Sequence, residues 1–198
     1  MPFLETILVD EGKTPFLKWH QQRLERTLRR HNLPVSYDLQ ERLTPPGSGR
    51  WRCRVVYDEH TLHIEYLPYT PRTIASLRLV EDNTIVYMDK TTERGVLNAL
   101  FALRGTADDV LLVQNGLLTD TTTANVACFI DGKWLTPKRP LLEGTARARF
   151  LAEGKLLKAD ITPDAALSAE RIAVMNALSG FVEVSGGIIH ATNPNLKG

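Results

Sequence analysis

Two short polar segments in the middle of the chain carry residues that could act together on one ligand. Lys90 stands in the segment 87–94, beside a predicted helix start, and Asp120 stands in the segment 118–126 among small hydroxylated residues. A helical pattern and a short apolar strand separate the segments, so the chain can fold both onto one site. Lysine can form a Schiff base with a carbonyl group, and a carboxylate can hold a protonated ring nitrogen. The pair therefore favours the chemistry of a pyridoxal phosphate (PLP) enzyme.

These two segments resemble the fold-type IV (class IV) aminotransferase family, which includes branched-chain and D-amino acid aminotransferases and 4-amino-4-deoxychorismate lyase. Three more segments match the family in its order along the chain: WHQQRL at 19–24, LEGTAR at 142–147 and MNAL at 175–178. Together the motifs cover almost the whole chain. The resemblance implies an α+β fold of two lobes, a small one over 1–84 and a larger PLP-binding one over 85–198, with the cofactor at the interface between them.

The resemblance also assigns roles to single residues. Lys90 is expected to be the catalytic residue: it forms the Schiff base with PLP, and its freed amine then removes and returns protons, which requires a lowered pKa. Asp120 is expected to hold the pyridine nitrogen, although the family usually places a glutamate there. Arg23 and the helix start at Thr145 and Ala146 are expected to bind the phosphate. The expected cofactor contacts are Arg23, Lys90, Arg94, Asp120, Asn125, Thr145, Ala146, Asn176 and Ala177.

The residues themselves leave other interpretations open. Arg23 could be a solvent-facing arginine on a basic helix, and Asp120 could be an acid in a turn that caps the next strand. Arg94, expected on the same helix face as Lys90, could instead pair with a carboxylate beside it in the sequence. The run 176–178 could be no more than the end of a buried strand.

Hydrophobic periodicity and turn residues predict the elements that must position these groups. In the first lobe we expect a strand over 3–9, a helix from about residue 16 to 32, a hairpin of strands over 51–57 and 62–66, and a strand over 77–80. In the second lobe we expect helices over 91–104, 145–153 and 165–167, strands over 108–114, 125–130, 133–135, 171–175, 181–184 and 188–189, and a strand ending near Ile161. Asn115-Gly116 and Asp131-Gly132 are typical of tight hairpin turns.

Composition restricts the class of protein. At 198 residues, with 43% apolar content, the chain can form one domain or two small lobes. Its net charge of +1 and the lack of a basic block argue against a nucleic-acid partner. Cys53 and Cys128 stand far apart in strand-like runs, which favours two buried, reduced thiols over a disulfide. No stretch approaches the about 18 apolar residues of a membrane span. We therefore expect a soluble, cytoplasmic protein with no membrane partner.

Metal chemistry is not expected. The histidines show no spacing typical of metal ligands, and no dinucleotide, P-loop or GxSxG motif is present. The five histidines are His20, His31, His60, His63 and His190.

The expected activity comes from the resemblance. The segments 90–94 and 176–178 are closer to the lyase branch of the family than to branched-chain transaminases. This implies a PLP-dependent lyase that converts 4-amino-4-deoxychorismate to 4-aminobenzoate and pyruvate. A class IV aminotransferase acting on branched-chain or D-amino acids is the alternative, and a PLP-fold binding protein without activity is another. The family usually has two strands before the segment that resembles 3–6, and it often completes its substrate wall from a neighbouring subunit. We therefore expect a homodimer that acts on a small-molecule amine.

Overall fold

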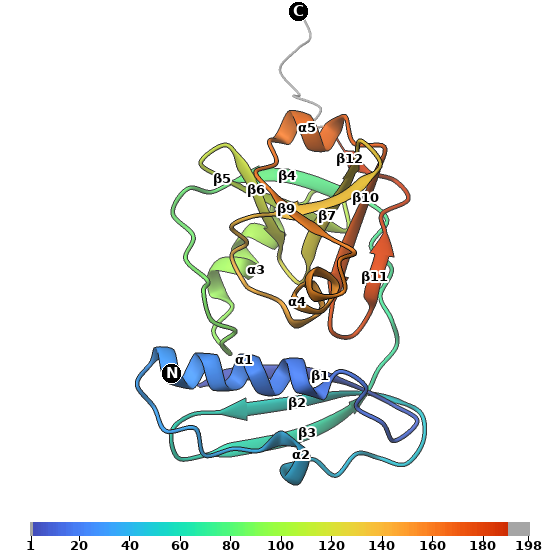
Figure 1. Cartoon of the computed structure of the whole chain (residues 1–198). Coiled ribbons are helices and arrows are strands. Elements are labelled where there is room, and N and C mark those ends of the chain that lie inside the picture. Colours follow the sequence, from blue (N-terminus) through green and yellow to red (C-terminus); the bar gives the residue numbers. More distant parts are fainter. Residues whose placement is uncertain (1, 190–198) are drawn as a thin grey trace, which may run out of the picture.

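The amino-terminal part of the chain is a three-stranded antiparallel sheet with one long helix packed on it (Figure 1). The structure is a computed structural model that describes residues 2–189, so His190 and the end of the predicted second lobe lie outside the described residues. The elements of this part are β1 (Phe3–Asp10), α1 (Leu17–Arg30), α2 (Leu39–Arg42), β2 (Arg50–Tyr57) and β3 (Leu62–Pro68). The predicted hairpin is confirmed, because β2 pairs with β3 from Trp51 opposite Pro68 to Tyr57 opposite Leu62.

Alternating burial along β1 explains where α1 packs. Every second residue over 3–9 is buried, as expected for a strand that turns one face to a core. Leu24 and Leu28 of α1 are fully buried and belong to the same apolar cluster. Glu5 is the one acidic residue in that buried row, and it is fully inaccessible to solvent. A buried carboxylate requires partners, which the candidate site supplies.

The rest of the described chain forms a mixed sheet of nine strands with three helices. The strand order is β11-β10-β7-β6-β5-β4-β12, and β8 pairs with both β7 and β9. The strands are β4 (Leu77–Glu81), β5 (Asp109–Gln114), β6 (Leu117–Thr121), β7 (Asn125–Ile130), β8 (Lys133–Pro137), β9 (Leu157–Ala159), β10 (Arg171–Asn176), β11 (Gly180–Glu183) and β12 (Ile188–Ile189). The helices are α3 (Gly95–Ala102), α4 (Thr145–Ala152) and α5 (Pro163–Leu167).

Both predicted hairpin turns are confirmed. Asn115 and Gly116 join β5 to β6 with φ values of 52° and 74°, and Asp131 and Gly132 join β7 to β8 with φ values of 49° and 74°. Two successive positive φ angles are what a two-residue hairpin turn requires, and asparagine, aspartate and glycine tolerate them. The hydroxyl-rich sequence of β6 did not predict a strand, yet the first of these turns pairs it with β5.

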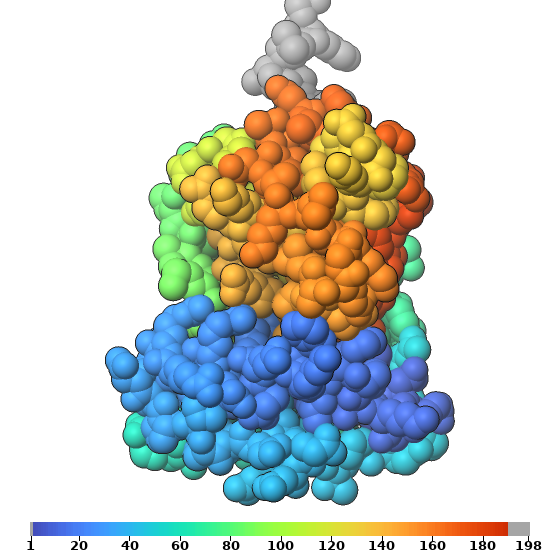
Figure 2. Space-filling view, in the orientation of Figure 1, coloured from blue at the N-terminus to red at the C-terminus, as the bar shows by residue number. Residues whose placement is uncertain are grey.

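The second sheet has a separate core on each face. Val110 and Leu112 of β5 pack against α3, whereas Leu111 packs with residues of α5 on the opposite face. Ala127 and Met175 pack with α4. In Figure 1, α3 and α4 lie on the side of the sheet nearer the amino-terminal part, and α5 lies at the far end. Figure 2 shows the two parts as adjoining surfaces, with the amino-terminal residues in blue.

The strand predicted at 77–80 belongs to the second sheet rather than to the first lobe. β4 pairs in parallel with β5 from Leu77 opposite Asp109 to Glu81 opposite Val113, and it also pairs with β12. Apolar periodicity indicates a strand but not the sheet that it joins, which explains the error. The boundary between lobes at residue 84 stays a prediction.

The helix predicted over 91–104 begins only at Gly95, with Arg94 as its N-cap. The preceding residues lie along the edge of β1 instead: the Lys90 carbonyl accepts a hydrogen bond from the Leu4 N–H at 2.8 Å, and the Thr92 N–H donates to the Pro2 carbonyl at 3.3 Å. The prediction that Lys90 and Arg94 share a helix face is therefore wrong. Pairing with a free strand edge replaces the first turn of the helix.

Candidate active site

A cavity of about 320 Å³ lies between the two parts of the chain. Its wall combines side chains of β1, α1 and β2 with side chains that follow β4, β6 and β10. Eight of the nine residues expected to contact a cofactor line it: Arg23, Lys90, Arg94, Asp120, Asn125, Thr145, Asn176 and Ala177. Ala146 is the second residue of α4, and its side chain is buried in the apolar cluster that also contains Ala127, Phe150 and Met175. Its side chain therefore belongs to the core.

Lys90 is partly buried in the cavity wall, and its pKa is lowered. Burial is the largest cause, the positive charges of Arg23 and Arg94 add to it, and the negative charge of Glu5 opposes it; the resulting pKa is about 8. A lysine with that pKa has a sizeable neutral fraction slightly above neutral pH, and only the neutral amine is a nucleophile or a base.

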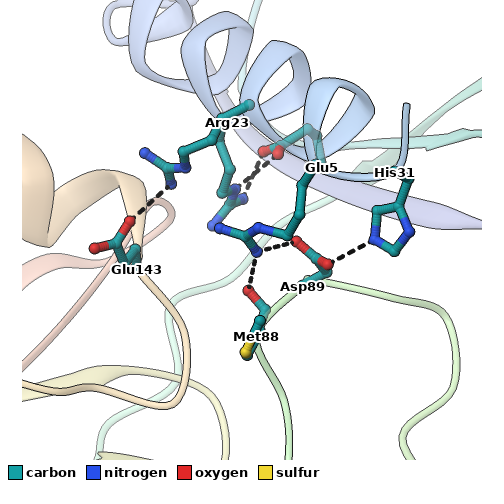
Figure 3. A network of polar contacts seen from close by, with 8 residues as sticks. Glu5, Arg23, His31, Met88, Asp89 and Glu143 are labelled. Carbon is teal, nitrogen blue, oxygen red and sulfur yellow. Dashed lines mark hydrogen bonds and ion pairs between the residues drawn. The ribbon is translucent and has the colours of Figure 1, made fainter. Parts of the chain in front are cut away.

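Arg23 is held by a buried carboxylate on the neighbouring strand. Its Nε and Nη2 donate to the two carboxylate oxygens of Glu5 at 2.7 and 2.5 Å, and Nδ1 of His20 lies 2.6 Å from the Glu5 Oε2 (Figure 3 shows the Arg23 pair). Burial raises the pKa of Glu5, but Arg23 and His20 outweigh it and hold the pKa at about 2. Arg23 is therefore not solvent-facing. Among the described residues Nη1 has no hydrogen-bond acceptor, which leaves that side of the guanidinium for a ligand.

Glu5 and His20 were missed from the sequence as parts of this site. The available signal was Glu5 itself, an acid at a position where alternation along β1 requires an apolar residue. Such a buried charge needs a cation, and the arginine of the next helix supplies it.

Asp120 is fixed by two hydrogen bonds at the end of β6. Its Oδ1 accepts from the Asn125 side-chain amide at 2.7 Å, and its Oδ2 accepts from the Leu142 backbone N–H at 2.8 Å. Burial raises the pKa of Asp120 to about 7, although these two hydrogen bonds oppose the shift. The same Asn125 amide donates to the Leu142 carbonyl at 2.8 Å. Asn125 therefore joins β6, β7 and the loop before α4.

The threonine run after β6 is organised by Asp109, which was also missed. Asp109 is buried at the start of β5, and it accepts hydrogen bonds from the Thr122 hydroxyl at 2.7 Å and the Thr123 hydroxyl at 3.2 Å. Arg94 then donates from Nη2 to the Thr122 carbonyl at 2.8 Å, instead of pairing with a neighbouring carboxylate. These contacts hold Arg94 against the cavity wall.

The first turn of α4 is an anion-binding feature of the cavity. Gly144 is its N-cap, and no side chain among the described residues caps it, so the backbone N–H groups at 145 and 146 have no helical acceptor. Free N–H groups and the helix dipole favour a negative group at this point.

The loop after β10 is shaped by Asn176. Its Oδ1 accepts hydrogen bonds from the Leu178 N–H at 2.9 Å, the Ser179 N–H at 2.9 Å and the Ser179 hydroxyl at 3.0 Å. This turn brings Asn176 and Ala177 to the cavity wall. A contact with a cofactor stays a prediction for both residues.

Cys53 and Cys128 are buried free thiols, as the sequence predicted. Within residues 2–189 no group of three or more histidine, cysteine, aspartate or glutamate residues could hold a metal ion. No helix of that range is long and apolar enough to cross a membrane.

Solved structures share this fold. A protein of Haemophilus somnus 129PT, provisionally named 4-amino-4-deoxychorismate lyase, is 30% identical; the match covers 90% of this chain and 97% of that chain with a TM-score of 0.84. The PLP-bound form of a hypothetical aminotransferase from Mycobacterium tuberculosis is 20% identical, with 92% and 80% covered and a TM-score of 0.78. The mixed α+β architecture is thus that of the fold-type IV PLP enzymes, as predicted.

Sequence comparison narrows this class to a family. The family described as amino-transferase class IV matches residues 55–186. An uncharacterized protein of Haemophilus influenzae Rd is 32% identical over 186 residues, which are 91% of this chain and 99% of that protein. The chain belongs to the class IV aminotransferase family and is an enzyme of that type. Membership and the PLP-bound relative imply PLP as the family's cofactor.

Proposed function

We propose that this enzyme is a PLP-dependent lyase that converts 4-amino-4-deoxychorismate to 4-aminobenzoate and pyruvate. The observation that carries the PLP chemistry of the proposal is the meeting, in one cavity, of a lysine with a pKa of about 8, a fixed carboxyl group and an anion-binding helix start. The provisional name of the Haemophilus somnus relative points to the same reaction.

The residues present fit PLP. The N–H groups of Thr145 and Ala146 and the Nη1 side of Arg23 would hold the phosphate. Lys90 would attach the cofactor, and Asp120 would pair with the ring nitrogen. When bound, PLP supplies an electron sink for negative charge on the carbon next to the substrate nitrogen.

Lys90 performs the proton transfers in this proposal. Its neutral amine takes the proton from the ring carbon that bears nitrogen, and the carbon–oxygen bond to the enolpyruvyl group then breaks. A proton is returned to the enolpyruvyl carbon that becomes the methyl group of pyruvate. Atoms balance without water or an oxidant, and the formation of an aromatic ring favours the products.

A class IV aminotransferase activity is the second candidate. The family match and the fold of the Mycobacterium tuberculosis aminotransferase favour it, since the same lysine and acid would serve. The two reactions differ in products, because a transaminase releases a keto acid derived from its amino donor and leaves the amine on the cofactor. A protein that holds PLP without turnover is the third candidate.

One set of assays separates the three. The purified enzyme with PLP is given 4-amino-4-deoxychorismate and pyruvate is followed with lactate dehydrogenase; in parallel, branched-chain and D-amino acids are tested with 2-oxoglutarate. We expect pyruvate release from the first substrate. Turnover only in the second assay would make the enzyme a transaminase, and PLP absorbance without turnover in either would leave a binding protein.

The attachment residue is tested separately. Borohydride reduction followed by peptide mass spectrometry should place the pyridoxyl group on Lys90. Lys90→Ala should fold and lose turnover, whereas Lys133→Ala, at an exposed residue on a hairpin, should behave as wild type. A pyridoxyl adduct on Lys133 or Lys138 would overturn the assignment.

We also propose that the enzyme is a homodimer. The support is the resemblance, because the family often completes its substrate wall from a second subunit. Light scattering of the purified enzyme should give twice the chain mass, and a monomer that is fully active would contradict the proposal.

A further inference from the structure

The charged groups that line the cavity are unequal in sign. Four are basic: Arg23, Arg52, Lys90 and Arg94. Asp120 is the only carboxyl group among the described lining residues, and burial keeps it partly protonated at neutral pH because its pKa is about 7. The cavity therefore carries an excess of positive charge.

The proposed function already assigns a role to two of these basic groups. Arg23 is paired with Glu5 and, in the proposed function, faces the cofactor phosphate. Lys90 is the reacting amine. Arg52 and Arg94 remain, and within residues 2–189 neither forms an ion pair with a carboxylate.

Arg52 reaches the cavity from the first sheet. On β2 it precedes the buried Cys53, so its side chain lies on the face of the sheet opposite the core. The residue is exposed and lines the cavity together with Leu4 and Thr6 of β1. Arg54 lies two residues further along the same face, but it does not line the cavity.

Arg94 reaches the cavity from the other part of the chain. Within the described part of the chain its Nη2 donates to the Thr122 carbonyl, so a neutral acceptor positions the guanidinium and no carboxylate compensates its charge. A ligand with two anionic groups can engage Arg52 and Arg94 together, because each guanidinium matches one carboxylate.

We infer that Arg52 and Arg94 each bind one carboxylate of the substrate, so that the site selects amines that carry two carboxylate groups. The inference rests on the proposed function in placing PLP on Arg23 and Lys90. 4-Amino-4-deoxychorismate carries two carboxylates, whereas a branched-chain amino acid carries one and would leave one guanidinium without an anion. Arg52 and Arg94 thus set specificity, while Lys90 carries out the proton transfers.

The test measures binding to the PLP-loaded enzyme by calorimetry with two probes that cannot react there. Chorismate has two carboxylates and no amine, and 4-hydroxybenzoate has one carboxylate. We expect Arg52→Gln to weaken chorismate binding by about tenfold or more, as for a lost charge-assisted pair, and Arg52→Lys to recover part of the loss. Arg94→Gln should have a similar effect. 4-Hydroxybenzoate can pair with only one of the two arginines, so one of the two glutamine variants should bind it with nearly wild-type affinity.

The control is Arg54→Gln, which removes the same charge from the same strand face outside the cavity and should leave chorismate affinity unchanged. In turnover, Arg52→Gln should raise KM for 4-amino-4-deoxychorismate and leave kcat within about twofold, since Arg52 binds both ground and transition state. Equal chorismate affinity in wild type and Arg52→Gln overturns the inference, even if pyruvate is released. Arginine-dependent chorismate binding without pyruvate release would support the inference and overturn the proposed reaction.

Discussion

The chemistry proposed for Lys90 depends on charges that come from distant parts of the sequence. Burial alone lowers the pKa of a lysine, and the nearby guanidinium groups of Arg23 and Arg94 lower it further. Glu5 opposes them, because its carboxylate favours the charged amine. The pKa of the amine thus depends on Arg23 and Glu5, which belong to the phosphate end of the proposed site, and on Arg94.

This arrangement predicts how cofactor uptake depends on pH. The neutral fraction of Lys90 rises as the pH passes its pKa, so the rate at which the apoenzyme takes up PLP should rise between pH 7 and pH 9 with a midpoint at about 8. Stopped-flow absorbance measures that rate. Lys133→Ala should not move the midpoint, and a midpoint near the ordinary lysine value of 10.5 would contradict the burial and charge effects.

Removal of Arg23 should damage both folding and cofactor binding. Arg23→Ala leaves Glu5 buried without its cation, so the free energy of unfolding should fall by about 3 kcal/mol or more. The affinity for PLP should fall by more than about tenfold. Urea unfolding and PLP titration measure the two effects.

Arg26→Ala is the matched control, because Arg26 lies one turn further along the same helix. The Arg26 side chain is 43% exposed and lies 3.5 Å from the carboxylate of Glu143, whose side chain is 55% exposed. Such a surface pair contributes little. If both variants bind PLP equally well, α1 does not face the cofactor.

Residue types predicted part of the site but not its supports. Lys90, Asp120 and Arg23 stand in recognisable segments, and all three line the cavity. Glu5 and Asp109 were missed. Each forms hydrogen bonds with residues 13 to 18 positions away in the sequence, and these residues come close only when the chain folds. A single sequence shows that such residues are charged but does not show which residues they contact.

At the scale of elements, the segment after β4 shows how tertiary pairing overrides local preference. The sequence over 91–104 is compatible with one helix, yet its first residues bond to Leu4 and Pro2 at the edge of β1. A strand edge offers unpaired N–H and C=O groups, and a nearby segment can satisfy them at the expense of a helical turn. The carbonyl of Lys90 is thereby tied directly to the amino-terminal sheet.

The loop before α4 depends on a glycine for its close approach to Asn125. A Cβ atom at Gly144 would fall well inside contact distance of the Asn125 Oδ1. Gly144→Ala should therefore displace Asn125 and release Asp120 and Leu142, which it holds. We expect a loss of about 1–3 kcal/mol in unfolding free energy and weaker PLP binding, since the anion-binding turn moves as well.

The control for that change is Gly95→Ala. Gly95 begins α3, has no atom within 4 Å of an added Cβ, and has no positive φ angle. Alanine there should be neutral or stabilise the protein by up to about 1 kcal/mol. Thermal unfolding and PLP titration of both variants give the comparison; a Gly144→Ala enzyme that matches Gly95→Ala would mean that Asn125 does not have to stay in place.

At the scale of the molecule, the sequence predicted two groups of strands but not how they are joined. β4 illustrates the limit, since its apolar pattern suits either sheet and only its pairing with β5 and β12 assigns it to the second. The contacts that join the two parts were also not predicted from the sequence. Arg30 and His31, at the end of α1, form hydrogen bonds with Asp89, about 58 residues further along the chain. Figure 3 shows the contact of His31 with Asp89 and the dashed lines that reach Asp89 and the Met88 carbonyl; Arg30 donates to that carbonyl at 3.2 Å.

Asp89 is positioned to hold the two parts together beside the reacting lysine. Its carboxylate accepts from Arg30 at 2.6 Å and lies 2.8 Å from Nε2 of His31, and its side chain is only 12% exposed. By contrast, a further ion pair between the parts joins Arg26 to Glu143 through two well-exposed side chains. Since solvent and salt weaken exposed pairs, Asp89 should matter more than Glu143.

Asp89→Asn should therefore loosen the junction without unfolding the enzyme. The variant keeps the size of the side chain but removes the negative charge that pairs with Arg30 and His31. The free energy of unfolding should fall by about 1 kcal/mol. The amides of Leu4 and Thr92, whose hydrogen bonds join β1 to the segment around Lys90, should exchange hydrogen faster, and PLP affinity should fall about threefold to tenfold. Glu143→Gln should change neither quantity. Hydrogen exchange read by mass spectrometry and PLP titration check both variants, and identical exchange at Leu4 and Thr92 in Asp89→Asn and wild type would show that strand-edge pairing alone holds the two parts in register.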